Sequence, residues 1–272
     1  MSVSTRASLQ DAEHIIETAR AMADAARAET LPRFRTALGV DNKRDGVDGA
    51  GFDPVTEADR EAEVAMRAVL EERRPQDGVH GEELGRAEGM SGLTWVIDPV
   101  DGTRAFLIGA PVWGTLIAAV AEDGPLFGII DQPWTGERWE GGLGHANLAS
   151  PHGTADLGVR GTRALDGALL CTTFPEVGTE AERAAFVRVA ERARLVRYGM
   201  DCYAYGLLAA GHVDLVIEAG LHAYDICAPI AVVEAAGGIV TNWEGGPAHA
   251  GGRAVAAATA ELHAAALDLL RG

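Results

Sequence analysis

The spacing of apolar residues predicts two amphipathic helices in the first quarter of the chain. From Ser8 to about Arg35, apolar residues recur every three or four positions among Glu, Asp and Arg: Leu9, Ala12, Ile15, Ile16, Ala19, Ala23 and Ala26. A second helix is expected after Thr56, with Asp59 three residues on as in a capping box, and it ends near Arg74-Pro75. The Gly- and Asp-rich segment 39–52 between them is predicted to be a polar, mobile loop, in which Lys43 is a solvated lysine rather than a catalytic one.

Short apolar runs between turn residues predict strands in the middle of the chain. Trp95 to Ile97 is expected to end a buried strand, because Pro99 has no N–H to continue the ladder. Residues 113–121, 126–133 and a short segment after Gly136 predict an antiparallel meander.

The second half of the chain alternates strand and helix patterns. The segment from Gly144 to about Gly158 is the best candidate for a lobe boundary, which divides the chain into lobes 1–145 and 146–272. Strands are expected at 168–173, 195–198, 212–218, 239–243 and 254–258, and helices at 180–193, 201–210, 230–236 and the C-terminus. Gly237 and Gly238 supply the residues that a helix C-terminus favours. The predicted fold class is α/β, with two lobes or one large domain.

Composition narrows the classes of function. The chain has 272 residues, of which 47% are hydrophobic, and a formal net charge of −17, which argues against a nucleic-acid partner because phosphate backbones are bound by clustered Lys and Arg. The three cysteines, Cys171, Cys202 and Cys227, are expected to be reduced core residues. No apolar run reaches the length of a membrane span and no signal-peptide core is present, so the cytoplasm is the expected compartment.

Candidate chemistry is concentrated in the stretch Asp98-Pro99-Val100-Asp101-Gly102-Thr103. If both carboxylates reach the mouth of the turn, they offer hard oxygen ligands to Mg²⁺, and the Val100 carbonyl offers another. The backbone N–H groups of Gly102 and Thr103 open a helix and form a seat for a phosphate. The competing interpretation is a simple polar turn, because Asp, Pro and Gly are common turn formers.

Three further carboxylates stand in short motifs elsewhere. Asp59 lies in Asp53-Pro54-Val55-Thr56-Glu57-Ala58-Asp59, Glu82 in His80-Gly81-Glu82-Glu83-Leu84-Gly85, and Asp225 in Tyr224-Asp225. Each also has a structural explanation, namely a capping box for Asp59, a surface loop for Glu82 and helix capping for Asp225.

Taken together, these four motifs resemble the inositol-monophosphatase superfamily of Mg²⁺-dependent, Li⁺-sensitive phosphomonoesterases. The resemblance covers nearly the whole chain, and the motifs occur in the family's order. The chain departs from the family where Tyr224 replaces the usual Trp and where Ala228-Pro229 follows instead of Ala-Ala, a difference expected to affect packing. The resemblance implies a layered αβαβα sandwich.

The resemblance also implies a role for each motif residue. Glu82, Asp98 and the Val100 carbonyl would hold one Mg²⁺, and Asp98, Asp101 and Asp225 the second, with Glu82 bordering a third, weaker site. Thr103, oriented by Asp59, would activate a water that attacks the phosphorus directly and in line. The ester phosphate would rest on the metals and on Gly102 and Thr103.

Within the superfamily, the nearer likeness is to histidinol-phosphatases of this fold. It is carried by Trp113-Gly114-Thr115, Asp131-Gln132-Pro133, Gly136-Glu137-Arg138-Trp139 and the segment Arg197 to Gly206. Asp201 would pair with an ammonium or imidazolium group of the substrate, and Glu218 matches a substrate-binding acid of the family. Helix capping explains Asp201 equally well, and Trp134 and Trp139 either flank the imidazole or pack the sheet edge.

The expected substrate is therefore L-histidinol phosphate, contacted by Asp101, Asp201, Glu218 and Asp225. Inositol monophosphate is the second candidate and a broad sugar or nucleotide phosphatase the third. A non-catalytic protein that binds a partner is disfavoured, because all four metal carboxylates are present. The family is commonly dimeric, so a homodimer is expected.

Overall fold

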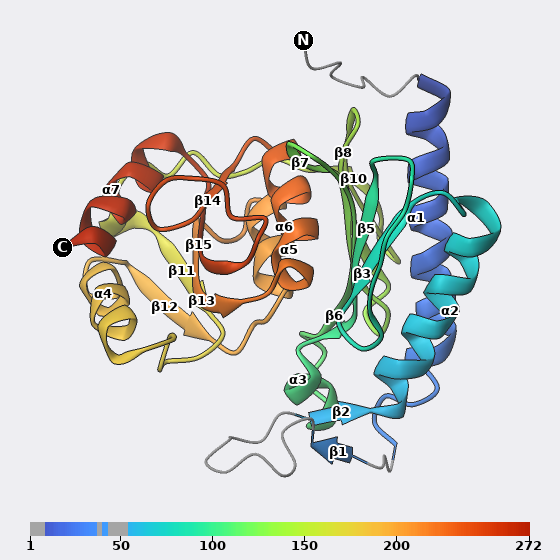
Figure 1. Ribbon diagram of the computed structural model, residues 1–272. Helices are drawn as coiled ribbons and strands as arrows, with labels where there is room; N and C mark the ends of the chain where they lie inside the picture. Colours follow the sequence, from blue (N-terminus) through green and yellow to red (C-terminus); the bar gives the residue numbers. More distant parts are fainter. Residues whose placement is uncertain (1–8, 37–39, 43–53) are drawn as a thin grey trace.

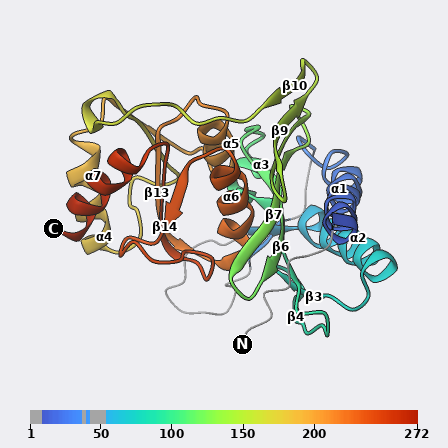
Figure 2. The same cartoon turned by 90° about the horizontal axis from the view of Figure 1, so that it is seen from above.

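The computed structural model describes residues 9–36, 40–42 and 54–272, and these residues form five stacked layers (Figure 1). One outer layer consists of α1 (Leu9–Thr30) and α2 (Glu57–Arg73), which cover one face of an eight-stranded sheet. Helices α5 (Tyr203–Ala209) and α6 (Ala223–Ala235) separate this sheet from a five-stranded one, whose far face carries α4 (Glu180–Ala190) and α7 (Ala260–Arg271). The view from above shows the same succession (Figure 2). The predicted layered αβαβα fold is confirmed.

The eight-stranded sheet contains the predicted meander. Its order is β10-β9-β8-β7-β6-β5-β3-β4, and only β3 and β5 pair in parallel. The strands are β3 (Gly78–Gly81), β4 (Gly85–Ala87), β5 (Thr94–Asp101), β6 (Gly114–Ala121), β7 (Gly124–Gln132), β8 (Glu137–Gly142), β9 (His145–Ser150) and β10 (Gly153–Asp156). The sheet thus continues past residue 145, through the segment in which we expected the lobe boundary. The division into two lobes stays a prediction.

The five-stranded sheet has the order β12-β11-β13-β15-β14, with β11 parallel to both β12 and β13. Its strands are β11 (Leu169–Thr172), β12 (Leu195–Tyr198), β13 (Leu215–Leu221), β14 (Ile239–Thr241) and β15 (Gly252–Ala257). The remaining elements are β1 (Val40–Asn42), β2 (Pro54–Thr56), the five-residue helix α3 (Thr103–Leu107) and the 3₁₀ turn η1 (Leu165–Gly167).

Alternation along β5 shows how one strand serves two cores. Trp95 and Ile97 belong to the core under α1 and α2, whereas Val96 belongs to the core around α5 and α6. Since successive side chains point to opposite faces of a sheet, a strand buried on both faces is apolar at every position. This explains the continuous run of Trp95, Val96 and Ile97.

Two predicted boundaries were wrong. Strand β5 does not end before Pro99 but runs to Asp101, with a register shift between Asp98 and Asp101 where it pairs with β6. A bulge leaves the proline's missing donor outside the ladder, so the strand continues. Helix α6 begins at Ala223, not Ile230, and contains Pro229. Proline disfavours the interior of a helix, and burial of the residues around Pro229 offsets this cost.

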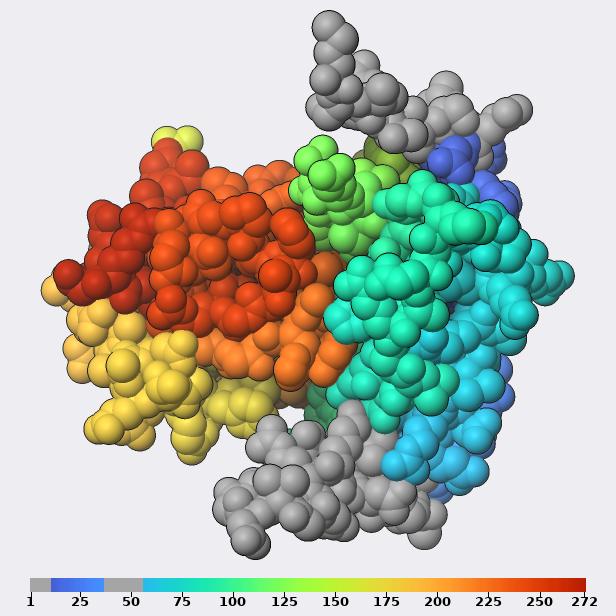
Figure 3. Space-filling view, viewed as in Figure 1, coloured from blue at the N-terminus to red at the C-terminus, as the bar shows by residue number. Residues whose placement is uncertain are grey.

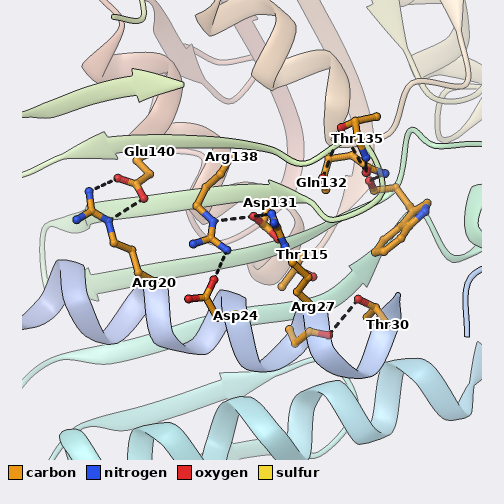
Figure 4. Close-up of polar contacts among 12 residues, drawn as sticks. Arg20, Asp24, Arg27, Thr30, Thr115, Asp131, Gln132, Thr135, Arg138 and Glu140 are labelled. Atoms are coloured by element: carbon orange, nitrogen blue, oxygen red, sulfur yellow. Dashed lines mark hydrogen bonds and ion pairs between the residues drawn. The ribbon is translucent and has the colours of Figure 1, made fainter. Parts of the chain in front are cut away.

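Helix α1 is fixed to the sheet by ion pairs as well as by apolar packing (Figure 4). The buried carboxylate of Asp131 on β7 binds Arg27 of α1 at 2.7 Å and Arg138 of β8 at 2.6 Å. On the same face, Glu140 of β8 binds Arg20 of α1 at 2.5 Å. The Asp131 and Arg138 segments that carried the histidinol-phosphatase likeness therefore have a structural role here.

Several expectations concern the chain as a whole. Cys171, Cys202 and Cys227 are buried and free, as predicted. Lys43 and most of the 39–52 loop lie outside the described residues. In the part of the chain that the structure describes, none of the helices combines the length and the apolar character needed to cross a membrane.

Candidate functional site

The bulge in β5 brings two carboxylates to the same place. In a regular strand Asp98 and Asp101, three positions apart, would point to opposite faces of the sheet. The register shift between them changes this, and oxygen atoms of Asp98, Asp101 and Asp225 all lie within 4.8 Å of one another. Asp225 comes from the first turn of α6, where its Oδ2 also accepts a hydrogen bond from the His222 N–H at 2.6 Å. Its capping role and its place in the cluster are thus compatible.

Glu82 lies beside this cluster, in the turn between β3 and β4. The turn is held by Glu63, a fully buried carboxylate of α2 that sequence reasoning missed. Glu63 accepts hydrogen bonds from the backbone N–H of Glu83 at 2.7 Å and of Leu84 at 3.1 Å. The sequence does contain a signal for this role, because Glu63 is an acidic residue on the same buried face of α2 as the apolar residues Ala62 and Met66.

Burial and mutual repulsion dominate the electrostatics of the cluster. Burial, followed by the negative charges of Glu82, Asp101 and Asp225, raises the pKa of Asp98 well above its usual value. Burial and the charges of Asp201 and Asp225 do the same to the pKa of Asp101, against a hydrogen bond from the Cys202 N–H at 2.7 Å. Hard oxygen donors that repel one another in this way fit a divalent cation, so the cluster could hold a metal ion.

Thr103 and Asp59, predicted as a pair, meet at the start of α3. The Thr103 hydroxyl lies 3.4 Å from Asp59 Oδ1 and 3.1 Å from the Val100 carbonyl oxygen. Asp59 is fully buried, and its Oδ2 accepts hydrogen bonds from the N–H and hydroxyl of Thr56, which confirms the capping box. The capping box therefore fixes the carboxylate that faces Thr103.

The backbone turns sharply between the cluster and α3. Gly102 has φ of 81°, and a Cβ there would lie 3.0 Å from the side chain of Asp201. Glycine is thus required both by its backbone conformation and by this close approach. Since α3 has only five residues, its dipole is small.

A pocket of about 250 Å³ opens beside the cluster. Its lining includes Asp101, Gly102, Thr103 and Asp225, together with both predicted substrate residues, Asp201 and Glu218. Figure 3 shows the two halves of the chain, green and cyan against orange and red, in contact along the middle of the molecule.

Asp201 does not cap α5. The N-cap is Cys202, without a side-chain hydrogen bond, and Asp201 has a left-handed φ of 44°. Burial raises the pKa of Asp201 to about 6, against the nearby charge of Arg104. This strained backbone places a carboxylate at the pocket instead of at the helix end.

Glu218 lies deeper, 5% exposed, on β13. It accepts hydrogen bonds from the N–H and hydroxyl of Thr173, at 2.8 and 2.9 Å, and from the Thr172 hydroxyl at 3.3 Å. Burial nevertheless raises the pKa of Glu218 to about 7.

The two tryptophans considered as imidazole contacts lie elsewhere. Trp139 is fully buried and packs edge-on against Tyr203, and Trp134 contacts Phe34 and Arg35; neither lines the pocket. The pocket instead has Arg104 and Phe174 in its wall, two residues that sequence reasoning did not select.

Known proteins resemble this chain in sequence and, among solved structures, in fold. The family model for the inositol monophosphatase family matches residues 11–271. Histidinol-phosphatase of Mycobacterium tuberculosis is 36% identical over 244 residues, 87% of this chain and 91% of that protein. The bifunctional phosphatase IMPL2, chloroplastic, of Arabidopsis thaliana is 41% identical over 83% of this chain, but the match spans only 63% of that protein.

Among solved structures, an inositol monophosphatase from Zymomonas mobilis superimposes with a TM-score of 0.83 at 40% identity, covering 96% of this chain and 98% of that one. The family match, over residues 11–271, includes the acidic cluster and the residues that line the pocket, and the structural match covers nearly all of the chain. The chain therefore belongs to the inositol monophosphatase family.

Proposed function

We propose that the protein is a Mg²⁺-dependent phosphomonoesterase that hydrolyses L-histidinol phosphate to L-histidinol and phosphate. Family membership supports a phosphoric monoester hydrolase. The observation that carries the narrower proposal is the presence of Asp201 and Glu218 in the same pocket as the acidic cluster. Neither belongs to the group of acids whose oxygens lie within metal-ligand reach of one another.

These two additional acids favour a cationic leaving alcohol. A phosphate ester bound with its phosphate at Gly102 and Thr103 would extend its alcohol portion past Asp201 toward Glu218. A carboxylate that loses water on binding is stabilised by a positively charged partner. Histidinol carries an ammonium group, whereas inositol carries only hydroxyls.

The residues that would hold the cofactor are Asp98, Asp101, Asp225, Glu82 and the Val100 carbonyl, for two Mg²⁺ ions, with Glu82 bordering a third site. Mg²⁺ bound there would neutralise the phosphate dianion and promote ionisation of the attacking water. The protein's own part is positioning. With its proton directed to Asp59 or Val100, the Thr103 oxygen can accept a hydrogen bond from that water and align it with the phosphorus.

The test is phosphate release with Mg²⁺ from L-histidinol phosphate and from myo-inositol 1-phosphate, side by side, in the wild type and in Asp201→Ala. We expect a preference for histidinol phosphate that is lost in the variant. Asp156→Ala, an exposed aspartate of β10, is the matched control and should behave as wild type. Preference for inositol phosphate would overturn the substrate assignment and leave the class of reaction standing.

Inositol monophosphatase activity is the second candidate, supported by the 40% identity to the Zymomonas mobilis structure.

Inhibition by Li⁺, a cytoplasmic location and a homodimer are further parts of the proposal. Adding LiCl to the same phosphate-release assay tests the inhibition by Li⁺. Cell fractionation tests the location, and the mass in solution by light scattering tests the dimer, which a monomer would contradict.

A further inference from the structure

The pocket has a wall that the proposed chemistry does not use. Arg104 follows Thr103 in α3, and Phe174 follows Thr173 just after β11, so the two come from different halves of the chain. Both line the pocket, and the guanidinium carbon of Arg104 lies 5.0 Å from the centre of the Phe174 ring. This distance is within the range of a cation–π interaction.

Phe174 keeps 44% of its surface exposed, although a phenylalanine ring is more stable when buried. Arg104 lies on the ring and limits its orientations. The structure therefore presents a flat, partly open aromatic surface at the rim of a polar pocket. Such a surface gains most from a ligand that is itself flat and can stack on it.

The pocket thus offers three different environments along its lining. Gly102 and Thr103 form the proposed phosphate end, Asp201 and Glu218 supply negative charge, and Arg104 with Phe174 supplies the flat wall. Among the described residues that line the pocket, Arg104 is the only basic one. A substrate with a phosphate, a cationic group and a planar ring would satisfy all three.

We propose that the Arg104–Phe174 pair is a specificity element that stacks on a planar heteroaromatic ring in the leaving alcohol. This inference rests on the proposed function and refines it, because it assigns the imidazole of histidinol to this wall and the ammonium group to the acids. Phe174 contacts the ring directly, and Arg104 is a positioning residue that holds Phe174.

The experiment compares L-histidinol phosphate, which carries both a phosphate and a ring, with inorganic phosphate, which has no ring. For each variant we would measure KM and kcat for L-histidinol phosphate and the inhibition constant of inorganic phosphate. Phe174→Leu should raise KM for histidinol phosphate about five- to tenfold with kcat within about twofold, and Phe174→Tyr, which keeps the ring, should stay near wild type. Arg104→Gln should raise KM about threefold. The inhibition constant of inorganic phosphate should not change in any of them.

Trp134→Leu is the matched control, because Arg35 lies 4.7 Å from the Trp134 ring in a similar pair outside the pocket lining. It should leave KM, kcat and the inhibition constant of inorganic phosphate unchanged. The inference is overturned if Phe174→Leu leaves KM for histidinol phosphate unchanged. It is also overturned if Arg104→Gln weakens the binding of inorganic phosphate as much as the binding of histidinol phosphate, because Arg104 would then be a phosphate ligand. If the wild type does not hydrolyse histidinol phosphate, the proposed function fails first and this refinement fails with it.

Discussion

Asp98 is 2% exposed and lies among three other carboxylates, Glu82, Asp101 and Asp225. In the proposed site it would contact both metal ions, so replacing its charge should weaken both. We expect Asp98→Asn to lower kcat/KM by about a thousandfold, the loss of several kcal/mol of transition-state stabilisation. Steady-state phosphate release at saturating Mg²⁺ measures this, and activity within about tenfold of wild type would contradict the role.

Glu218 makes a prediction about pH and stability. Its pKa rises from 4.5 to about 7 on folding because the carboxyl is buried, so the folded protein holds this proton more tightly than the unfolded chain. The contribution of this carboxyl to stability is therefore largest below pH 4.5, where it is protonated in both states. It falls as the pH rises from 4.5 to 7 and is smallest above pH 7, where the buried carboxyl must ionise. Glu218→Gln, which does not ionise, should raise the free energy of unfolding relative to wild type by roughly 2–3 kcal/mol more at pH 8 than at pH 5.

Urea unfolding at the two pH values, with EDTA present, measures the difference. The hydrogen bonds from Thr173 can still be accepted by the amide oxygen of glutamine, so the variant isolates the charge. An equal effect at both pH values would show that the carboxyl is not the titrating group.

Residues in short motifs could be predicted from the sequence, whereas residues that act through tertiary contacts could not. The Asp59–Thr103 pair and the cluster of Asp98, Asp101 and Asp225 came together as expected. Glu63 and Phe174 were missed, because their positions depend on where a distant loop or helix packs. Trp139 was left open, since a buried aromatic has the same local sequence pattern whether it faces a core or a ligand.

At the level of elements, α1 depends on a few charged contacts to the sheet. Asp131 is fully buried and pairs with two arginines. Removing its charge takes away the ion pair of the partly buried Arg27, whereas Arg138 keeps its second pair with Asp24. We expect Asp131→Asn to reduce the free energy of unfolding by about 2–4 kcal/mol. Glu88→Gln, which removes an exposed pair with Arg86, should cost less than about 1 kcal/mol in the same denaturant titration. Equal losses would contradict the role of burial.

The elements themselves were largely predictable, with instructive exceptions. The helix after Thr56 and the meander follow from local patterns that agree with the fold. The end of strand β5 and the start of helix α6 did not follow, because each element contains a proline that the fold accommodates, at a bulge in β5 and by burial of the surrounding residues in α6. Local preference decides an element where packing is weak, whereas α6 is buried along most of its length.

At the scale of the whole molecule, the proposed metal site joins residues of the first sheet to Asp225 of α6, so metal binding should stabilise the entire fold. At a Mg²⁺ concentration about 100 times Kd, linkage predicts about 2.7 kcal/mol and a rise in Tm of about 5–10 °C. Thermal unfolding with Mg²⁺ and with EDTA measures this shift. The shift should be much smaller in Asp98→Asn, and a shift of the same size there would place the ion elsewhere.

Two glycines determine how closely α6 approaches the first sheet. A Cβ at Gly128 would lie 2.6 Å from the Ala228 carbonyl oxygen, and one at Gly141 would lie 2.4 Å from the Val232 Cα. Helix and sheet therefore touch backbone to backbone, and the helix that carries Asp225 has little freedom to shift. By contrast, the side chains at positions 104 and 174 lie at an open rim. Selection for a different leaving alcohol can thus exchange the rim residues one at a time while the reaction centre is inherited unchanged.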